Sequence, residues 1–266
     1  MADERGASTG EPAAAEGEPA AAEGEPAAAE GEPATPEPED RSRRTGEVQQ
    51  FYGRWTGLYD LIARYSPRVG RLRADVADEL DLSPGDTVID VGCGTGANLP
   101  YLRERVGPEG TVIGVDVTEP MLQHARQRAA RNGWDNVHLL RADGARLPVE
   151  GPVDAVTATF VVGMFEEPAE VVEHWCGLAR GGRIAVANLS PSDRPIAGPL
   201  NALFHVITVL STPPTTKLRY ETSLLGTLRE RVVTGEAVIE ERGVDTHHEQ
   251  RHLGYVRISS ATIPEE

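Results

Sequence analysis

Three short groups of residues have the spacing to bind a small charged ligand. The first is residues 88–97, Val-Ile-Asp-Val-Gly-Cys-Gly-Thr-Gly-Ala, which follow a β-branched run and open an amphipathic segment. Glycines at such a place let the backbone approach a ligand closely, and a helix that begins there presents free amides and a positive dipole. The other two groups are carboxylates: Asp116, twenty residues after Gly96, and Asp143, which precedes Gly144.

The glycine pattern by itself fits two cofactors. Gly92, Gly94 and Ala97 satisfy the fingerprint of dinucleotide-binding proteins, and Asp116 would accept hydrogen bonds from ribose hydroxyls in either case. Asp90, however, stands directly before the glycines, where its carboxylate would repel a pyrophosphate. It suits the amino group and the sulfonium of S-adenosylmethionine, so this cofactor is predicted, and an NAD-dependent oxidoreductase is the alternative.

The segments around these residues alternate between short β-branched runs and amphipathic runs. Strands are predicted at 87–91, 111–116, 137–141, 153–160 and 183–189, with helices at 97–105, 120–131 and 168–179 between them. Such alternation predicts a parallel sheet with helices on both faces. Strands at 244–249 and 255–260 follow, and their connection is too short for a crossover helix, so they should form an antiparallel hairpin. The predicted fold is therefore α/β: a Rossmann-like, doubly wound, mostly parallel seven-stranded sheet.

Asp143 falls where the third strand leaves the carboxyl edge of this sheet, which is the edge at which open α/β folds bind ligands. It could accept a hydrogen bond from an adenine amino group; a solvated loop acid or a helix cap is the alternative.

The two ends of the chain differ in composition. Residues 1–40 contain twelve acids and one Arg, and a Gly-Glu-Pro unit recurs every seven residues. A proline in each repeat argues against a coiled coil, so residues 1–45 are predicted to be a disordered acidic tail. Residues 46–266 then form one domain. Within it, 46–82 are predicted as N-terminal lid helices, and 190–235, which hold no obvious strand–helix unit, as a substrate-side insertion.

With these features in place, residues 50–260 resemble the class I S-adenosylmethionine-dependent methyltransferases. The similarity is greatest to the branch with the ubiquinone/menaquinone-biosynthesis C-methyltransferases. In that family Asp90, Gly92, Gly94, Thr95 and Gly96 match the cofactor motif. The family also implies the following roles: ribose binding by Asp116, an adenine-side contact at Asp143-Gly144, a fourth-strand contact at Thr159, and a lid residue at Tyr59. Thr159 as a plain strand residue and Tyr59 as helix core are the alternatives.

The resemblance does not extend to the segment that would bind the methyl acceptor. Arg180 replaces the proline usual before the Gly181-Gly182 turn, and residues 190–235 match only loosely. The predicted function is methyl transfer to a small-molecule acceptor, such as a quinone or lipid precursor. No catalytic residue is assigned, although His205 is a candidate base, and a non-catalytic cofactor-binding protein is a further alternative.

The composition of the chain argues against several other kinds of binding partner. The chain has a net charge of −16, of which residues 1–40 contribute a net −11, and this acidity argues against nucleic-acid binding. Two cysteines without zinc spacing predict no metal site, and adjacent His247 and His248 would point to opposite faces of a strand. Neither a signal peptide nor an integral membrane segment is predicted, so the expected location is cytoplasmic, with peripheral membrane contact and the oligomeric state left open.

Overall fold

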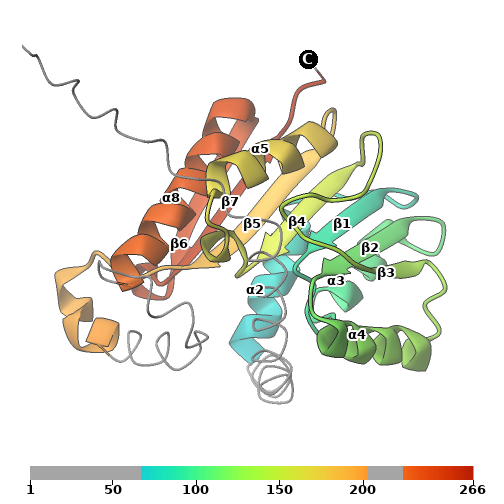
Figure 1. Cartoon of the computed structure of the whole chain (residues 1–266), viewed down its shortest axis with the longest axis horizontal. Helices are drawn as coiled ribbons and strands as arrows, with labels where there is room; N and C mark the ends of the chain where they lie inside the picture. Colours follow the sequence, from blue (N-terminus) through green and yellow to red (C-terminus); the bar gives the residue numbers. More distant parts are fainter. Residues whose placement is uncertain (1–66, 203–223, 266) are drawn as a thin grey trace, which may run out of the picture. The chain divides into compact units, whose positions relative to one another are not determined.

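The computed structural model describes residues 67–202 and 224–265, and their centre is a seven-stranded sheet (Figure 1). The strand order is β3-β2-β1-β4-β5-β7-β6. The first five strands are parallel, and β7 pairs antiparallel with both β5 and β6. The predicted fold class, including the C-terminal hairpin, is confirmed. The strands are β1 (Thr87–Val91), β2 (Thr111–Asp116), β3 (Val137–Arg141), β4 (Ala155–Thr159), β5 (Arg183–Leu189), β6 (Val244–Arg251) and β7 (Val256–Thr262).

The helices begin and end at residues that suit helix termini. Proline stands at the first turn of three helices, where its missing amide is not needed. Gly133 ends one of them in the left-handed conformation and donates its amide back to the last turn. The described helices are α2 (Pro67–Asp78), α3 (Leu99–Val106), α4 (Glu119–Asn132), α5 (Pro168–Leu178) and α8 (Leu224–Arg242), with short 3-10 turns η1 (Val162–Met164), η2 (Pro195–Ala197) and η3 (His252–Gly254).

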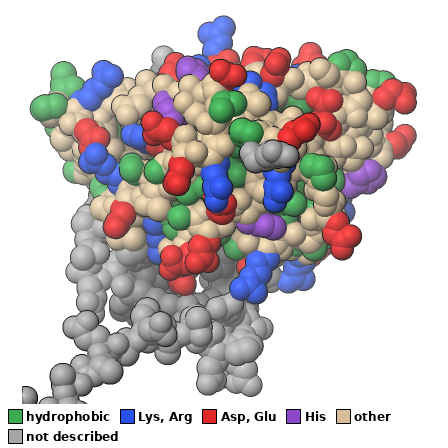
Figure 2. Space-filling model, turned by 90° about the horizontal axis from the view of Figure 1, so that it is seen from above, with side chains coloured by type: hydrophobic (Ala, Val, Ile, Leu, Met, Phe, Trp, Pro, Cys, Tyr) green, Lys and Arg blue, Asp and Glu red, His purple; other side chains and the backbone are tan. Residues whose placement is uncertain are grey.

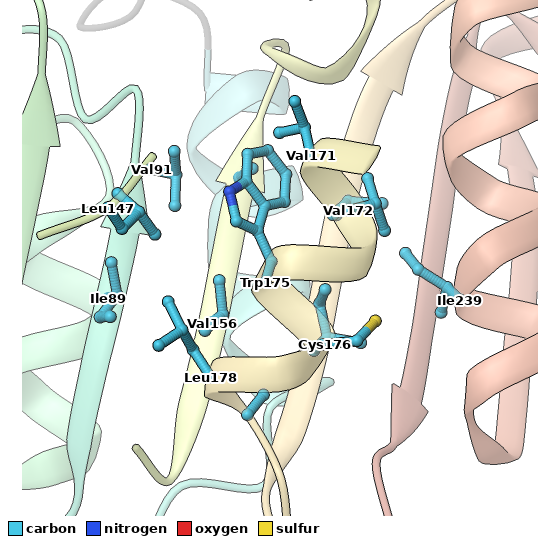
Figure 3. Close-up of a cluster of buried hydrophobic side chains, with 14 of the residues drawn as sticks. Ile89, Val91, Leu147, Val156, Val171, Val172, Trp175, Cys176, Leu178 and Ile239 are labelled. Atoms are coloured by element: carbon cyan, nitrogen blue, oxygen red, sulfur yellow. The ribbon is translucent and has the colours of Figure 1, made fainter. Parts of the chain in front are cut away.

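Each face of the sheet has its own hydrophobic core. On one face α5 and α8 bury Trp175 and Ile239 against the central strands, and Figure 3 shows Trp175 projecting from α5 toward Val91 and Val156. The other face is covered by α2, α3 and α4, whose buried residues form a second cluster with Val88 of β1. Trp175 is fully buried in the first of these clusters. The sheet is thus packed on both faces, and the carboxyl ends of its strands form the edge at which open α/β sheets bind ligands.

The surface carries mixed charge. In the view from above, Figure 2 shows acidic and basic side chains interspersed over the face that is visible. Among the described helices, none combines the length and the apolar composition needed to cross a membrane.

One helix begins earlier than the sequence predicts. The sequence leaves residues 236–242 ambiguous between helix and strand, and it predicts no strand–helix unit within 190–235, yet α8 starts at Leu224. The reason is tertiary: Gly235 weakens local helix propensity, but its lack of a side chain lets α8 pack against η1, where a Cβ would lie 2.5 Å from Val162 Cγ1. Tyr59 and His205 lie outside the described residues.

Candidate cofactor-binding site

The predicted ligand residues meet where the strand order reverses. The chain proceeds from β1 outward to β2 and β3, and then returns to place β4 on the other side of β1. Open α/β sheets bind ligands at such a switch point, beyond the carboxyl ends of the strands. Asp90 is the penultimate residue of β1, and Thr159 and Asp116 are the last residues of β4 and β2. The topology therefore brings these three side chains to one edge.

A single buried amide joins the two strands of the switch point. Asn98 Nδ2 donates to Asp90 Oδ1 at 2.8 Å and to Thr159 Oγ1 at 3.1 Å. Asp90 is fully buried, and its Oδ2 has no hydrogen-bond partner among the described residues. Burial raises the pKa of Asp90 to about 7, against the lowering effect of the Asn98 bond and of Arg73. An unpartnered carboxylate oxygen at this depth is suited to a cationic ligand group.

Arg73 lies on the other side of the same amide. Its Nη1 donates to Asn98 Oδ1 at 2.6 Å, and its guanidinium carbon lies 5.7 Å from the centre of the Phe160 ring. Its Nε is buried and has no partner in the part of the chain that the structure describes. Burial lowers the pKa of Arg73, and the negative charge of Asp90 opposes that shift. The site thus holds a cation and a carboxylate, separated by one asparagine.

Helix α2, which carries Arg73, is fixed to the C-terminal hairpin. Arg251 of β6 forms an ion pair with Asp75. Glu79, just after α2, accepts hydrogen bonds from Ser260 Oγ at 2.6 Å and, through its backbone oxygen, from Arg183 Nε at 2.9 Å. These contacts fix the position of α2 against the sheet.

Asp116 anchors the glycine-rich turn. Its Oδ2 accepts from the Gly94 amide at 2.9 Å, and its Oδ1 accepts from the Thr118 amide at 2.7 Å. Burial raises the pKa of Asp116, and these backbone bonds act in the opposite direction. The Thr118 side chain also hydrogen-bonds to this carboxyl. Since an ionised carboxylate can accept about four hydrogen bonds, Asp116 can still accept from a ligand hydroxyl.

The glycines of the turn serve different purposes. Gly92 has φ +65°, and a Cβ there would lie 2.5 Å from Val161 Cγ2. Gly94 has φ +55°, but no atom lies within 4 Å of where its Cβ would be. Gly96 again has no room, because a Cβ would lie 2.5 Å from Leu99 Cδ1. Packing therefore excludes side chains at Gly92 and Gly96, whereas the space beside Gly94 is open to a ligand. Thr95 between them is buried.

Asp143 and Gly144 lie at the same edge. The Ala142 amide donates to the backbone oxygen of Asp116 at 3.2 Å, so the turn starts beside Asp116. Asp143 is exposed, and its Oδ1 accepts from the Ala145 amide at 2.9 Å. A Cβ at Gly144 would lie 2.8 Å from Val91 Cγ1. Asp143 therefore stabilises its own turn, Gly144 permits close packing, and contact with adenine stays a prediction for both.

Sequence reasoning missed Asn98 and Arg73. An asparagine at a helix start is ordinarily interpreted as a cap, but Asn98 makes no side-chain cap hydrogen bond and uses its amide in the network instead. Arg73 falls within a predicted helix, and no local signal distinguishes it from a solvated arginine. Only the packing of α2 against the switch point reveals both.

The other candidate metal-binding and nucleophilic residues either lie outside this site or are made unreactive by burial. His247 Nδ1 lies 3.0 Å from Glu79 Oε1, while His248 Nδ1 lies 2.9 Å from Ser259 Oγ. The described residues contain no group of His, Cys, Asp and Glu side chains that could hold a metal ion. Burial raises the pKa of the Cys93 thiol, which argues against a nucleophilic thiolate.

Comparison with known proteins decides the family. A family model described as a methyltransferase domain matches residues 82–213. The phosphatidylethanolamine N-methyltransferase of Cereibacter sphaeroides is 34% identical over 163 residues, which cover 59% of this chain and 73% of that protein. The chain belongs to the class I S-adenosylmethionine-dependent methyltransferases. This settles the cofactor as S-adenosylmethionine and removes the nicotinamide alternative.

Other methyltransferases match over shorter shares of their length. Nocamycin O-methyltransferase of Saccharothrix syringae is 37% identical over 145 residues, covering 53% of this chain and 50% of that protein. Demethylmenaquinone methyltransferase of Shouchella clausii is 32% identical over 126 residues, covering 47% and 54%. The chain therefore spans about half the length of these two relatives. A crystal structure of a methyltransferase from Aquifex aeolicus shares the fold, with a TM-score of 0.53, 21% identity and coverage of 77% and 93%.

Proposed function

We propose that this methyltransferase transfers the methyl group of S-adenosylmethionine to a small acceptor with an apolar body, of the quinone or lipid-precursor type. The observation that carries the proposal is the buried junction of Asp90, Asn98 and Thr159 at the switch point. The proposed cofactor residues are Asp90, Gly92, Gly94, Thr95, Gly96, Asp116, Asp143, Gly144 and Thr159, together with Tyr59.

The charges at the junction fit the methionine part of the cofactor. The ammonium group would bind at the unpartnered Oδ2 of Asp90, and the carboxylate at the guanidinium of Arg73. Asn98, which bonds both residues, would hold them at a fixed separation. Asp116 would accept the ribose hydroxyls, and Gly94, which has open space beside it, would let the cofactor approach the backbone.

The apolar character of the acceptor is inferred from the rim of this edge. Because β7 runs antiparallel to β5, η3 lies at the end of the sheet where β5 ends. The loop after β5 is fixed to η3 by hydrogen bonds from Ser192 Oγ to the Leu253 oxygen and from Tyr255 Oη to the Ala197 oxygen. Of the eight exposed large hydrophobic side chains among the described residues, five lie on this rim: Met164, Leu189, Ile196, Leu200 and Leu253.

Transfer requires little covalent chemistry from the protein. S-adenosylmethionine supplies a methyl group that its sulfonium already activates. The acceptor atom forms a bond to that carbon as the carbon–sulfur bond breaks; the electron pair stays on sulfur, and the acceptor proton passes to water. The residues above would align the two reactants and exclude water, which is the larger part of catalysis in such a displacement.

The test is calorimetric titration of the protein with S-adenosylmethionine, S-adenosylhomocysteine and NADH, followed by methyl transfer to a panel of acceptors. Asp116→Ala should weaken binding of the first two severely, because the ribose acceptors and the anchor of the turn are both lost. Asp135→Ala, at an exposed turn position, is the matched control. Unchanged affinity in Asp116→Ala would contradict the assignment of the site.

A further inference from the structure

Asn98 joins two oppositely charged residues through the two ends of one amide. Its Oδ1 accepts from Arg73, and the two hydrogens of its Nδ2 go to Asp90 and Thr159. Turning the amide by 180° would place its oxygen against the Asp90 carboxylate and its NH2 group against the Arg73 guanidinium. The partners therefore determine one orientation for this buried side chain.

The backbone of Asn98 is held by helix α3. Its backbone oxygen accepts from the amides of Tyr101 and Leu102 at 3.0 and 3.2 Å, as the residue before a helix does. Its side chain makes no cap hydrogen bond to α3. The amide is thus presented from a fixed point of the backbone, and it is used in the network between the charges.

Helix α2, which carries Arg73, is held closely against α3. Arg105 of α3 donates to the backbone oxygen of Ala74 at 2.9 Å. At Gly70 a Cβ would lie 3.0 Å from the hydroxyl of Tyr101, so the two helices pack tightly side by side (Figure 1). If the bridge between the charges were shortened, the flexible side chain of Arg73 would move, whereas α2 would stay in place.

Neither of the two charges is fully satisfied. Asp90 Oδ2 and Arg73 Nε are buried and have no hydrogen-bond partner among the described residues. Burial lowers the pKa of Arg73 and raises that of Asp90, and in both cases the charge of the other residue acts in the opposite direction. A guanidinium and a carboxylate at this depth would form a strong, bidentate ion pair if they met. The amide of Asn98 stands between them in the hydrogen-bonded chain.

We propose that Asn98 is a positioning residue that keeps Arg73 and Asp90 from pairing with each other, so that both charges remain available to a zwitterionic ligand group. The amide can bond both residues, and it carries no charge that would neutralise either. The inference rests on the proposed function, in which Asp90 binds the ammonium and Arg73 the carboxylate of the cofactor. It adds that the site is held open against the attraction between its own charges.

The experiment removes the bridge with Asn98→Ala and measures binding of S-adenosylhomocysteine by calorimetry at alkaline pH. We expect the affinity to fall at least about 100-fold, because Arg73 then pairs with Asp90 and both charged contacts to the ligand are lost. Adding Arg73→Leu to this variant should raise the affinity again by about tenfold, since the carboxylate of Asp90 is released. If Asn98 only supported the fold, the second substitution would weaken binding further.

A second variant and a second ligand accompany this test. Asn98→Ser should fold, because serine suits the position before a helix, and it should give the same order of affinities, because its hydroxyl is too short to bond both charges. The ligand 5′-methylthioadenosine lacks the amino acid part of the cofactor, so it should bind every variant within about twofold of the wild type.

Asn136→Ala is the matched control. Asn136 Nδ2 also donates two hydrogen bonds, to the backbone oxygens of Gly107 and Gly110, which precede β2 at the opposite edge of the sheet. This variant should lose stability and bind S-adenosylhomocysteine as the wild type does.

A further readout needs no ligand. Stability of the wild type should fall as the pH rises toward the pKa of Asp90, which burial raises to about 7. The ion pair expected in Asn98→Ala favours the ionised carboxylate and lowers that pKa, so the loss of stability between about pH 4 and 8 in urea denaturation should be smaller than in the wild type. Adding Arg73→Leu removes this ion pair, and the loss should then be larger than in the wild type. The other ionisable groups that act on this pair are the same in every variant: Asp116, Tyr101 and Arg128.

Three results would overturn the inference. The first is an affinity of Asn98→Ala for S-adenosylhomocysteine within about twofold of the wild type. The second is a double variant that binds no better than Asn98→Ala. The third is failure of both Asn98 variants to fold or to bind 5′-methylthioadenosine, which would make Asn98 a support of the whole site. A wild-type protein that binds no S-adenosylmethionine would instead contradict the proposed function, and the urea profiles would still test the separation of the two charges.

Discussion

Replacing Asp90 with asparagine should make the unliganded protein more stable at alkaline pH and weaken its binding of S-adenosylmethionine. Burial raises the pKa of this carboxyl to about 7 from an ordinary value of 3.8. Between these two pH values the folded state holds a proton that the unfolded state has released. Stability therefore falls as pH rises through this range, and the full penalty is present above the folded pKa.

The magnitude follows from the difference between the two pKa values. Each unit of pKa difference corresponds to about 1.4 kcal/mol, so a difference of roughly three units gives a penalty of about 4 kcal/mol near pH 8. The amide introduced by the substitution would carry no charge, and its oxygen could still accept from Asn98. The free energy of unfolding of Asp90→Asn should thus exceed that of the wild type by up to about 4 kcal/mol near pH 8, and by little near pH 4.

The assay is urea denaturation of both proteins at several pH values between about 4 and 8. The difference between the two proteins isolates Asp90, since every other titrating group is shared. Asp135→Asn, at an exposed turn, controls for the substitution itself. In calorimetric titration near pH 8, Asp90→Asn should bind S-adenosylmethionine at least about tenfold more weakly, because a hydrogen bond to a charged group is lost.

This reasoning is refuted if the free energies of unfolding of the wild type and Asp90→Asn change with pH in the same way. Such a result would mean that the carboxylate is ionised in the folded protein at little cost, and that its depth does not desolvate it. Greater stability together with undiminished cofactor affinity would preserve the burial argument and remove Asp90 from the binding site.

Two further substitutions test neighbouring parts of the site. Arg73→Leu should weaken binding of S-adenosylhomocysteine roughly 10- to 100-fold by calorimetry, since the carboxylate would lose a charged donor; Arg71→Leu, at an exposed position of the same helix, should bind as the wild type does. Gly92→Ala should destabilise the protein by about 1–3 kcal/mol more than Gly133→Ala in urea denaturation. Both glycines have positive φ, but only at Gly92 does the added Cβ meet a side chain. Equal losses would show that Val161 moves aside.

Local patterns in the sequence were sufficient for the family and the fold class, and they also predict where the site lies. The alternation of short β-branched and amphipathic runs has one main solution, a parallel sheet. Asp90 is the penultimate residue of one strand and Asp116 the last residue of another, and such a sheet must align these strand ends at one edge. Gly94, with open space beside it, fits the need for a backbone that a ligand can approach, whereas Gly92 and Gly96 are required by packing. These features depend on residues close together in the chain, so they can be predicted without a structure.

Only the tertiary structure decided which distant side chains meet. Asn98 lies 61 residues from Thr159 and 25 from Arg73, yet one amide bonds both. The hydrogen bond from Ser260 Oγ to Glu79 likewise joins residues that are 181 positions apart in the chain. Hydrogen bonds of this kind are set by strand register and by which face of an element is covered. Propensity and periodicity describe each element alone and do not contain that information.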